Sequence, residues 1–164
     1  EVDSNLSFLI PFVSDRIKEQ FLGLASLEGL TQRVQLVDGN ARECLSASDA
    51  ALLASGTAAL EAALVGCPMV VAYRVSGLSY RIATSLASTR TVSMPNHLMP
   101  VPLVPEFLQQ DATTENLVPA VQRLLADGPG TKRMRDALSG IQRTLNLDTN
   151  HRIVDAILDT VQRS

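Results

Sequence analysis

The chain contains no tryptophan and few other aromatic residues, with four Phe and two Tyr among 164 residues. Hydrophobic residues nevertheless make up 46% of it, so Leu, Ala, Val and Ile must build the interior. That composition is typical of a parallel sheet covered by helices. The length is sufficient for one domain with a sizeable core and no need for disulfides or metal.

Cysteine is also scarce. Cys44 and Cys67 are the two cysteines of the chain, and both lie in apolar segments. Their spacing fits neither a metal site nor a paired redox motif. We therefore expect two buried free thiols, as in a protein of a reducing compartment, and place the protein in the cytoplasm.

The chain lacks an excess of positive charge, since 14 Lys and Arg face 17 Asp and Glu, a net charge of −3. The basic residues are scattered, which argues against nucleic acid as a partner. No apolar run reaches the roughly 18 residues of a membrane helix, and no basic region precedes a hydrophobic leader. The sequence predicts a protein that neither spans a membrane nor is exported. Peripheral membrane contact stays open, because a small patch suffices for it.

Short apolar runs alternate with amphipathic stretches through the first two thirds of the chain. This alternation predicts parallel strands joined by right-handed helical crossovers, hence an α/β fold with a Rossmann-like, doubly wound parallel sheet. The run at 50–54 is continuous and predicts a strand buried on both faces. We expect strands at 7–11, 33–37, 50–54, 69–73 and 91–93, and helices at 15–27, 40–47, 57–65 and 79–86.

The last third of the chain has a different residue pattern. Residues 94–105 hold four prolines, which predicts an ordered loop without a helix or central strand. C-terminal helices are expected after it, at 106–109, 114–126, 131–145 and 150–162. We predict one nucleotide-sugar-binding domain over 1–126, with helices of 127–164 that pack on that domain, on a partner subunit or on a missing domain.

The sharpest local feature is Ser55-Gly56-Thr57, at the point where a strand ends and a helix begins. In open parallel sheets ligands bind beyond the carboxyl ends of the strands, and a helix N-terminus offers unpaired amides and the positive end of its dipole. Glycine allows close approach of phosphate oxygens, and the two hydroxyls add donors. The segment fits a diphosphate, although Ser or Thr before a helix is more often an N-cap.

Glu61 follows four residues after Thr57, on the same face of the predicted helix. A capping box would need an acid at 58 or 60, and those positions hold Ala58 and Leu60. Glu61 lies one turn, about 6 Å, beyond the helix start, the reach from a diphosphate to a ribose diol. A carboxylate accepts two hydroxyl hydrogens well. Considered alone, it is an ordinary solvated helix charge.

Several weaker candidates follow other strands. Tyr73 and Arg74 end a strand on the same edge as Ser55, where the guanidinium could neutralise phosphate or simply face solvent. Asn96 lies in the proline-rich segment, where it suits either a sugar hydroxyl or ordinary turn chemistry. Glu106 and Gln109 belong to a polar cluster whose default interpretation is a solvated helix start.

The motifs of catalysis are missing. The chain has no glycine-rich phosphate loop with lysine, no Gly-x-Ser-x-Gly elbow and no His or Cys cluster for a metal. The residues therefore predict a binding protein with no catalytic residue of its own, no metal and no cofactor.

Residues 48–74, SDAALLASGTAALEAALVGCPMVVAYR, resemble the central signature of the lipid-A-disaccharide synthase family. The similarity continues through 92–96 and 104–113, and upstream through 8–11 and 36–39. It implies one half of a GT-B glycosyltransferase. The implied enzyme is an inverting UDP-dependent hexosyltransferase that moves 2,3-diacylglucosamine from UDP to 2,3-diacylglucosamine 1-phosphate, forming the lipid A disaccharide 1-phosphate without a metal.

By this resemblance Ser55, Gly56 and Thr57 hold the diphosphate and Glu61 holds the ribose. The residues implied to line the rest of the donor pocket are Arg74, Asn96, Glu106 and Gln109. The acceptor site and the catalytic base are expected in an N-terminal domain that this sequence does not contain. Peripheral contact with the inner membrane is implied, and the C-terminal helices are a candidate homodimer surface.

The chain departs from the family pattern in two places. Family members usually carry a Gly-Ser-Arg segment with a strand and a helix ahead of the strand matched by 8–11, and here that strand comes almost at once. The family's Ala-Gly-Arg-Glu stretch reads Met99-Pro-Val-Pro102, which removes an arginine contact. Two alternatives stay open: an epimerase of UDP-N-acetylglucosamine on the same GT-B frame, and a non-catalytic nucleotide-binding module.

Overall fold

The computed structural model describes residues 6–24, 32–54, 56–74 and 91–145, and the structural statements that follow concern these residues. All of their strand pairings are parallel. Strand β1 (Phe8–Phe12) pairs with β2 (Val34–Asp38) in one sheet. A second sheet has the order β3 (Ala51–Leu53), β4 (Met69–Tyr73), β5 (Glu106–Leu108).

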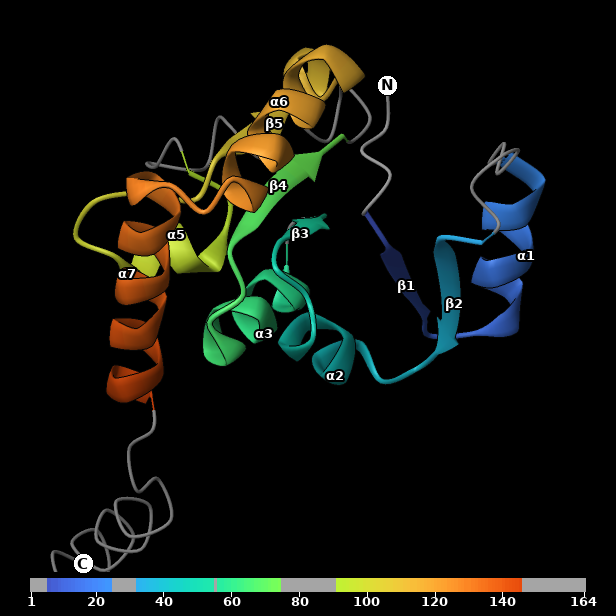
Figure 1. Ribbon diagram of the computed structural model, residues 1–164, viewed down its shortest axis with the longest axis horizontal. Helices are drawn as coiled ribbons and strands as arrows, with labels where there is room; N and C mark the ends of the chain where they lie inside the picture. Colours follow the sequence, from blue (N-terminus) through green and yellow to red (C-terminus); the bar gives the residue numbers. More distant parts are fainter. Residues whose placement is uncertain (1–5, 25–31, 55, 75–90, 146–164) are drawn as a thin grey trace, which may run out of the picture.

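Helices connect and cover these strands (Figure 1). Their bounds are α1 Asp15–Leu24, α2 Ala41–Ser46, α3 Thr57–Val65, α5 Met94–Leu98, α6 Thr114–Leu125 and α7 Pro129–Leu145, with a 3₁₀ turn η1 at Gln109–Asp111. The α/β class, the parallel strands with flanking helices and the helical C-terminal region are confirmed. No helix among the described residues has the length and apolar character needed to cross a membrane.

The β3–α3–β4 unit follows its sequence signals closely. Helix α3 begins at Thr57 and ends at Val65, as predicted. Gly66 closes it in the left-handed conformation, φ 74°, which favours glycine. Pro68 then prevents continuation of the helix, and β4 starts at Met69.

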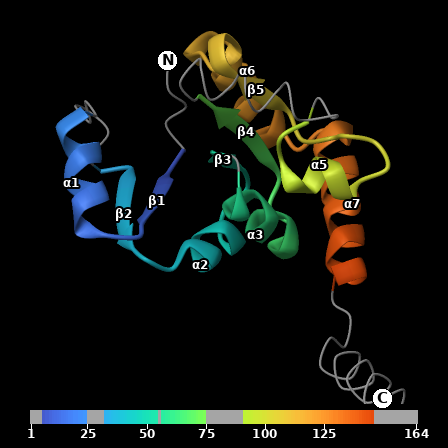
Figure 2. The same cartoon turned by 180° about the vertical axis from the view of Figure 1, so that it is seen from behind.

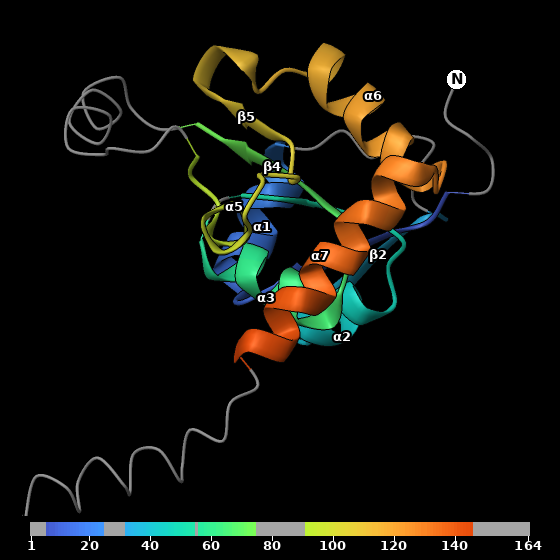
Figure 3. The ribbon, with the colours of Figure 1, turned by 90° about the vertical axis from the view of Figure 1, so that its left-hand side faces the viewer.

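The core lies around β4. Met69, Val70 and Val71 are fully buried, as are the three alanines of α3 that face them, Ala59, Ala62 and Ala63. Because alanine side chains are short, α3 packs closely on the sheet. Helix α7 packs against α3 (Figure 3) and adds Met134, Leu138 and Ile141 to the same core. The aliphatic interior expected from composition is confirmed.

The strands form two sheets, where the sequence predicted one. Seen in Figures 1 and 2, the strands follow in the order β2, β1, β3, β4 across the molecule, and β1 and β3 are not paired. Consequently β3 is an edge strand, and the prediction that 50–54 is buried on both faces was wrong. The Leu52 side chain is 52% exposed.

The segment from 91 to 109 differs most from expectation. Residues 91–93 form no strand, and the proline-rich stretch contains the helix Met94–Leu98. Pro95 is compatible with this helix because it occupies the first turn, where its missing N–H has no intrahelical partner to lose. The helix expected at 106–109 is instead strand β5 followed by η1, because Phe107 and Leu108 pair with the end of β4. The helices expected at 79–86 and 150–162 lie outside the described residues.

Candidate functional site

The turn between β3 and α3 has the backbone of a ligand-binding helix start. Gly56 is the N-cap residue of α3, with φ 120° and ψ −150°, a conformation that L side chains rarely adopt. Having no side chain, it leaves the first-turn amides of α3 without a side-chain cap. Gly56 and Thr57 are exposed, and a Cβ at Gly56 would meet no atom within 4 Å. Ser55 lies outside the described residues.

Helix α3 is divided into a buried and an exposed side. Ala59, Ala62 and Ala63 are fully buried, whereas Thr57 and Glu61 are both exposed. The spacing of four residues therefore puts the Thr57 hydroxyl and the Glu61 carboxylate on one solvent-facing side. Among the described residues the ion pairs join Lys18 to Asp38 and Arg135 to Asp127, and Glu61 takes part in neither. Its carboxylate is available to a ligand that reaches the start of the helix.

The ends of β4 and β5 come to the same sheet edge. The register pairs Leu53 with Val71 and Tyr73 with Leu108. Arg74 and Gln109 therefore follow neighbouring, paired residues, beyond the carboxyl ends of their strands. Arg74 is exposed, Tyr73 is 36% exposed and Gln109 is buried with φ 52°. The structure thus brings Gly56, Thr57, Tyr73 and Arg74 to one edge, as the sequence predicted for strand ends, and adds Gln109, which the sequence had placed at a helix start.

Asn96 and Glu106 have a different setting. The Asn96 amide is 4% exposed; its Nδ2 donates to the Val104 carbonyl at 2.9 Å and to Glu106 Oε1 at 2.6 Å. Its Oδ1 accepts the amides of Leu103 and Val104, both at 3.0 Å. Both donors and both acceptor positions of this amide are therefore used within the chain.

The Glu106 carboxylate is occupied in the same way. Oε2 accepts the Val92 amide at 2.7 Å, and Oε1 accepts the amide and the hydroxyl of Ser93 at 3.0 and 2.6 Å in addition to Asn96. Ser93 is the N-cap of α5, so this carboxylate takes the role that an acid in the helix itself has in a capping box. A ligand could bind Asn96 or Glu106 only if these bonds were broken.

The family is decided by comparison with known proteins. The family model for lipid-A-disaccharide synthetase matches residues 1–156. The chain belongs to the lipid-A-disaccharide synthase family. It is 40% identical over 158 residues to the lipid-A-disaccharide synthase of Pectobacterium carotovorum, and 39% identical over the same length to those of Salmonella newport and Salmonella paratyphi A. Each of these alignments covers 96% of this chain and 41% of the relative, so the chain spans about two fifths of the length of the relatives it matches.

Within this family member, sequence reasoning missed the role of Ser93. The Ser93 hydroxyl and amide both donate to Glu106, and Ser93 is fully buried. One signal was present: Ser93 precedes Asn96 by three residues, the spacing of a helix cap and its N3 partner. The four prolines of the segment concealed that signal, because they argue against a helix.

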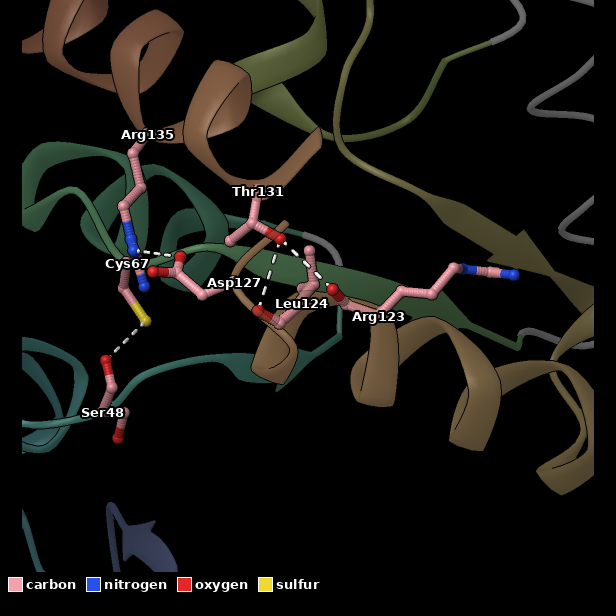
Figure 4. Close-up of polar contacts among 7 residues, drawn as sticks. All are labelled: Ser48, Cys67, Arg123, Leu124, Asp127, Thr131 and Arg135. Atoms are coloured by element: carbon pink, nitrogen blue, oxygen red, sulfur yellow. Dashed lines mark hydrogen bonds and ion pairs between the residues drawn. The ribbon is translucent and has the colours of Figure 1, made fainter. Parts of the chain in front are cut away.

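The cysteines of this family member behave as structural residues. Cys44 and Cys67 are buried free thiols, as predicted. Cys67 Sγ lies 3.6 Å from the Ser48 carbonyl and close to the ion pair between Arg135 and Asp127, whose atoms are 2.6 Å apart (Figure 4). Burial raises the pKa of Cys67 to about 11, so it stays protonated at neutral pH. Among the described residues no His, Cys, Asp and Glu cluster could hold a metal ion.

Proposed function

We propose that this chain is the UDP-donor-binding half of an inverting glycosyltransferase of lipid A biosynthesis. The donor is UDP-2,3-diacylglucosamine, the acceptor is 2,3-diacylglucosamine 1-phosphate, and the product is the lipid A disaccharide 1-phosphate. One observation carries the proposal: a glycine-capped helix start with an exposed glutamate one turn later stands at the carboxyl edge of a parallel sheet, in a member of this family.

The proposed contacts follow from the geometry. The first-turn amides of α3, with Ser55, Gly56 and Thr57, hold the diphosphate, since a helix N-terminus suits an anion. Glu61, on the same side of the helix, accepts the two ribose hydroxyls. Arg74, at the end of the neighbouring strand, adds positive charge beside the phosphates.

The remaining pocket residues are assigned by their setting. Tyr73 and Gln109 follow the same strand ends and line the pocket beside Arg74. The polar atoms of Asn96 and Glu106 bind other groups of the chain at 2.6 to 3.0 Å. These two residues therefore contribute to the proposed pocket by fixing the segment around them. No metal or cofactor is needed for this mode of binding.

The chemical step needs groups from elsewhere. Inverting transfer requires a base within hydrogen-bond reach of the acceptor hydroxyl and a second surface that excludes water. Of the acids assigned to the proposed pocket, Glu61 is assigned to ribose and the Glu106 carboxylate is occupied. We infer that the 164 residues alone bind UDP and form no disaccharide. The base and the acceptor site then belong to the remainder of the enzyme, working in the cytoplasm at the inner membrane, with the C-terminal helices as a candidate dimer surface.

Calorimetric titration with UDP and with pyrophosphate tests the site. UDP at one hundred times its dissociation constant should stabilise the fold by about 2.7 kcal/mol. Glu61→Ala should weaken UDP by about tenfold, the value of a charged hydrogen bond, and leave pyrophosphate unchanged. Glu19→Ala, an exposed acid on α1, is the matched control and should change neither. Equal losses for both ligands in Glu61→Ala would rule out the ribose role.

Product analysis separates the candidate functions. The chain and the whole Pectobacterium relative are each given UDP-2,3-diacylglucosamine and the monosaccharide 1-phosphate. We expect disaccharide from the relative and none from the 164 residues. Disaccharide from the isolated chain at a comparable rate would refute the two-domain account. Interconversion of UDP-N-acetylglucosamine epimers would instead support the epimerase, for which the described residues offer His97, exposed and 3.4 Å from the Thr91 hydroxyl.

A further inference from the structure

Residues 91–105 contain no lysine, arginine, aspartate or glutamate, and several of their apolar side chains face solvent. Met94 and Leu98 lie one turn apart on α5 and are 44% and 47% exposed. Val101, in the loop after α5, is 64% exposed. These three side chains form an uncharged apolar patch, and clustered apolar exposure of this kind marks an interaction surface.

The chain fixes the patch in its outward position. Met99, which lies between Leu98 and Val101 in the sequence, is 7% exposed and packs in the core. The Asn96 amide binds the backbone at the far end of the loop, at 3.0 Å. Because the middle and both ends of the loop are held, its apolar side chains are ordered before a partner arrives. Binding through them therefore costs little conformational entropy.

The loop also has few peptide donors to remove from water. Pro100 and Pro102 are exposed, and neither has an N–H. An unpaired peptide N–H is costly in hydrocarbon, which normally excludes irregular loops from it. Prolines on both sides of Val101 lower that cost at the most exposed residue of the patch. The loop is thus suited to shallow insertion into an apolar phase.

Positive charge is concentrated on helix α7. This helix has four basic residues against one acid, Asp136, a charge of +3 in a chain whose net charge is −3. Lys132, Arg133 and Arg143 are exposed, and the ion pairs of the described residues involve none of them. Lys132 and Arg133 stand near the N-terminal end of α7, where the helix dipole disfavours a cation. Helix stability does not explain their position, which suits an anionic partner.

The apolar patch and the basic helix share one side of the molecule. Helix α5 contacts α7, and Met99 belongs to the same core cluster as Met134, Leu138 and Ile141 on the buried side of α7. The exposed residues of α7 lie on its other side. Figure 3 looks onto this side of the molecule, with α7 running across it and α5 and the following loop alongside.

We propose that this side of the chain, the lipid face, docks on an anionic lipid bilayer. The lipid face is defined by three apolar and three basic exposed residues: Met94, Leu98, Val101, Lys132, Arg133 and Arg143. The apolar three enter the region below the headgroups, and the basic three contact the lipid phosphates. An apolar patch beside cations matches a bilayer, which has hydrocarbon beneath negative headgroups. A nucleic acid would use the cations and leave the apolar patch exposed.

Vesicle flotation without nucleotide tests the proposal. The 164-residue chain is mixed with vesicles of phosphatidylethanolamine and phosphatidylglycerol, or with vesicles of uncharged phosphatidylcholine. We expect binding to the anionic vesicles and at least about tenfold weaker binding to the uncharged ones, since each Lys or Arg near an anionic surface contributes about a factor of five. High salt should weaken binding to the anionic vesicles, because it screens the phosphates.

Leu98→Ser tests the apolar patch. It should weaken binding to the anionic vesicles by about tenfold, the contribution of burying one leucine side chain. Leu22→Ser is the matched control and should have no effect, since Leu22 is 46% exposed and lies on α1, at the other end of the molecule in Figure 1. An environment-sensitive fluorophore attached through Val101→Cys should shift to the blue on binding, and one attached through Leu22→Cys should not.

A double variant tests the basic side. Lys132→Ala combined with Arg133→Ala should weaken binding to the anionic vesicles by about 25-fold, a factor of five for each cation. Arg16→Ala combined with Arg42→Ala removes two exposed cations from α1 and α2 and should change binding by less than about twofold. UDP binding should be the same in all these variants, so a failure of the lipid face is distinguishable from a failure of the donor site.

Three results would overturn the proposal: no flotation with anionic vesicles, equal losses in Leu98→Ser and Leu22→Ser, or equal losses in the two double variants. A second copy of the chain on the same face would give a mass that rises with chain concentration and falls in Leu98→Ser, without flotation. That outcome would also overturn lipid docking.

Discussion

Helices α3 and α5 lie beside the larger sheet and start after Gly56 and after Ser93. The first turns of these two helices differ in how their polar groups are hydrogen-bonded. At α3 the cap has no side chain, φ is 120°, and the nearby polar groups Thr57 and Glu61 face solvent. At α5 the cap is buried, and Glu106 accepts its amide and its hydroxyl. Polar residues after a strand thus have two uses. Those with unused hydrogen-bonding capacity are candidates for a ligand, and those that are saturated hold the chain in place.

The largest expected effect comes from removing the saturated acid. Glu106→Ala leaves the amides of Val92 and Ser93 and the Asn96 side chain without their acceptor, and should lower the free energy of unfolding by about 3 kcal/mol. Glu61→Ala removes the same group from a solvent-exposed position and should change it by less than about 0.5 kcal/mol. Urea unfolding of both variants makes the measurement. Equal losses would abolish the distinction between the two helix starts.

Burial of Cys67, beyond the other end of α3, gives the next effect, through pH. Its folded pKa is about 11 against an ordinary value of 9.0, so the folded state retains the proton at pH values where the unfolded state loses it. This contribution is fully present below pH 9 and is lost as pH rises from 9 to 11, and amounts to about 3 kcal/mol. The difference in unfolding free energy between the wild type and Cys67→Ala should fall over that range. A constant difference would show that the thiol is not held protonated.

The smallest effects compare the two glycines that bound α3. Neither would have a Cβ within 4 Å of another atom, so alanine at either position costs only backbone strain. Gly56→Ala, at φ 120° and ψ −150°, should cost about 2 kcal/mol, and Gly66→Ala, in the left-handed region, about 1 kcal/mol. Only Gly56→Ala should also weaken UDP. Thermal unfolding and UDP titration of both variants check the order, and weakened UDP binding in Gly66→Ala would point to a general loss of fold.

The elements predicted correctly are those whose signals are local. Helix α3 and strand β4 were bounded by glycine, proline and a change in periodicity, and both were located to the residue. The errors arose where a residue distant in the sequence determines the local structure. Helix α5 is held by Glu106 through bonds to Val92 and Ser93, which lie 14 and 13 positions away. Strand β5 forms because β4 is beside it, and the exposure of Leu52 depends on what lies next to β3.

The candidate site divides in the same way. Gly56, Thr57, Tyr73 and Arg74 were predicted to share one edge because parallel strands end together, and the register places them there. The sequence could not reveal that Asn96 and Glu106 bind each other, since an amide and an acid ten positions apart carry no pattern. Hydrogen-bonding capacity that is already used becomes visible only in three dimensions.

The Asn96 amide has a consequence for sequence variation. This side chain belongs to α5 and accepts hydrogen bonds from the amides of Leu103 and Val104, so it fixes both ends of the short loop between them. Of the residues between, Met99 packs in the core, whereas the exposed Leu98 and Val101 contribute little to holding those ends together. Mutations at the exposed positions can accumulate while α5 and β5 keep their places. The exposed part of this loop can therefore diverge in composition without a change of fold, as long as the Asn96 side chain keeps its bonds to both ends.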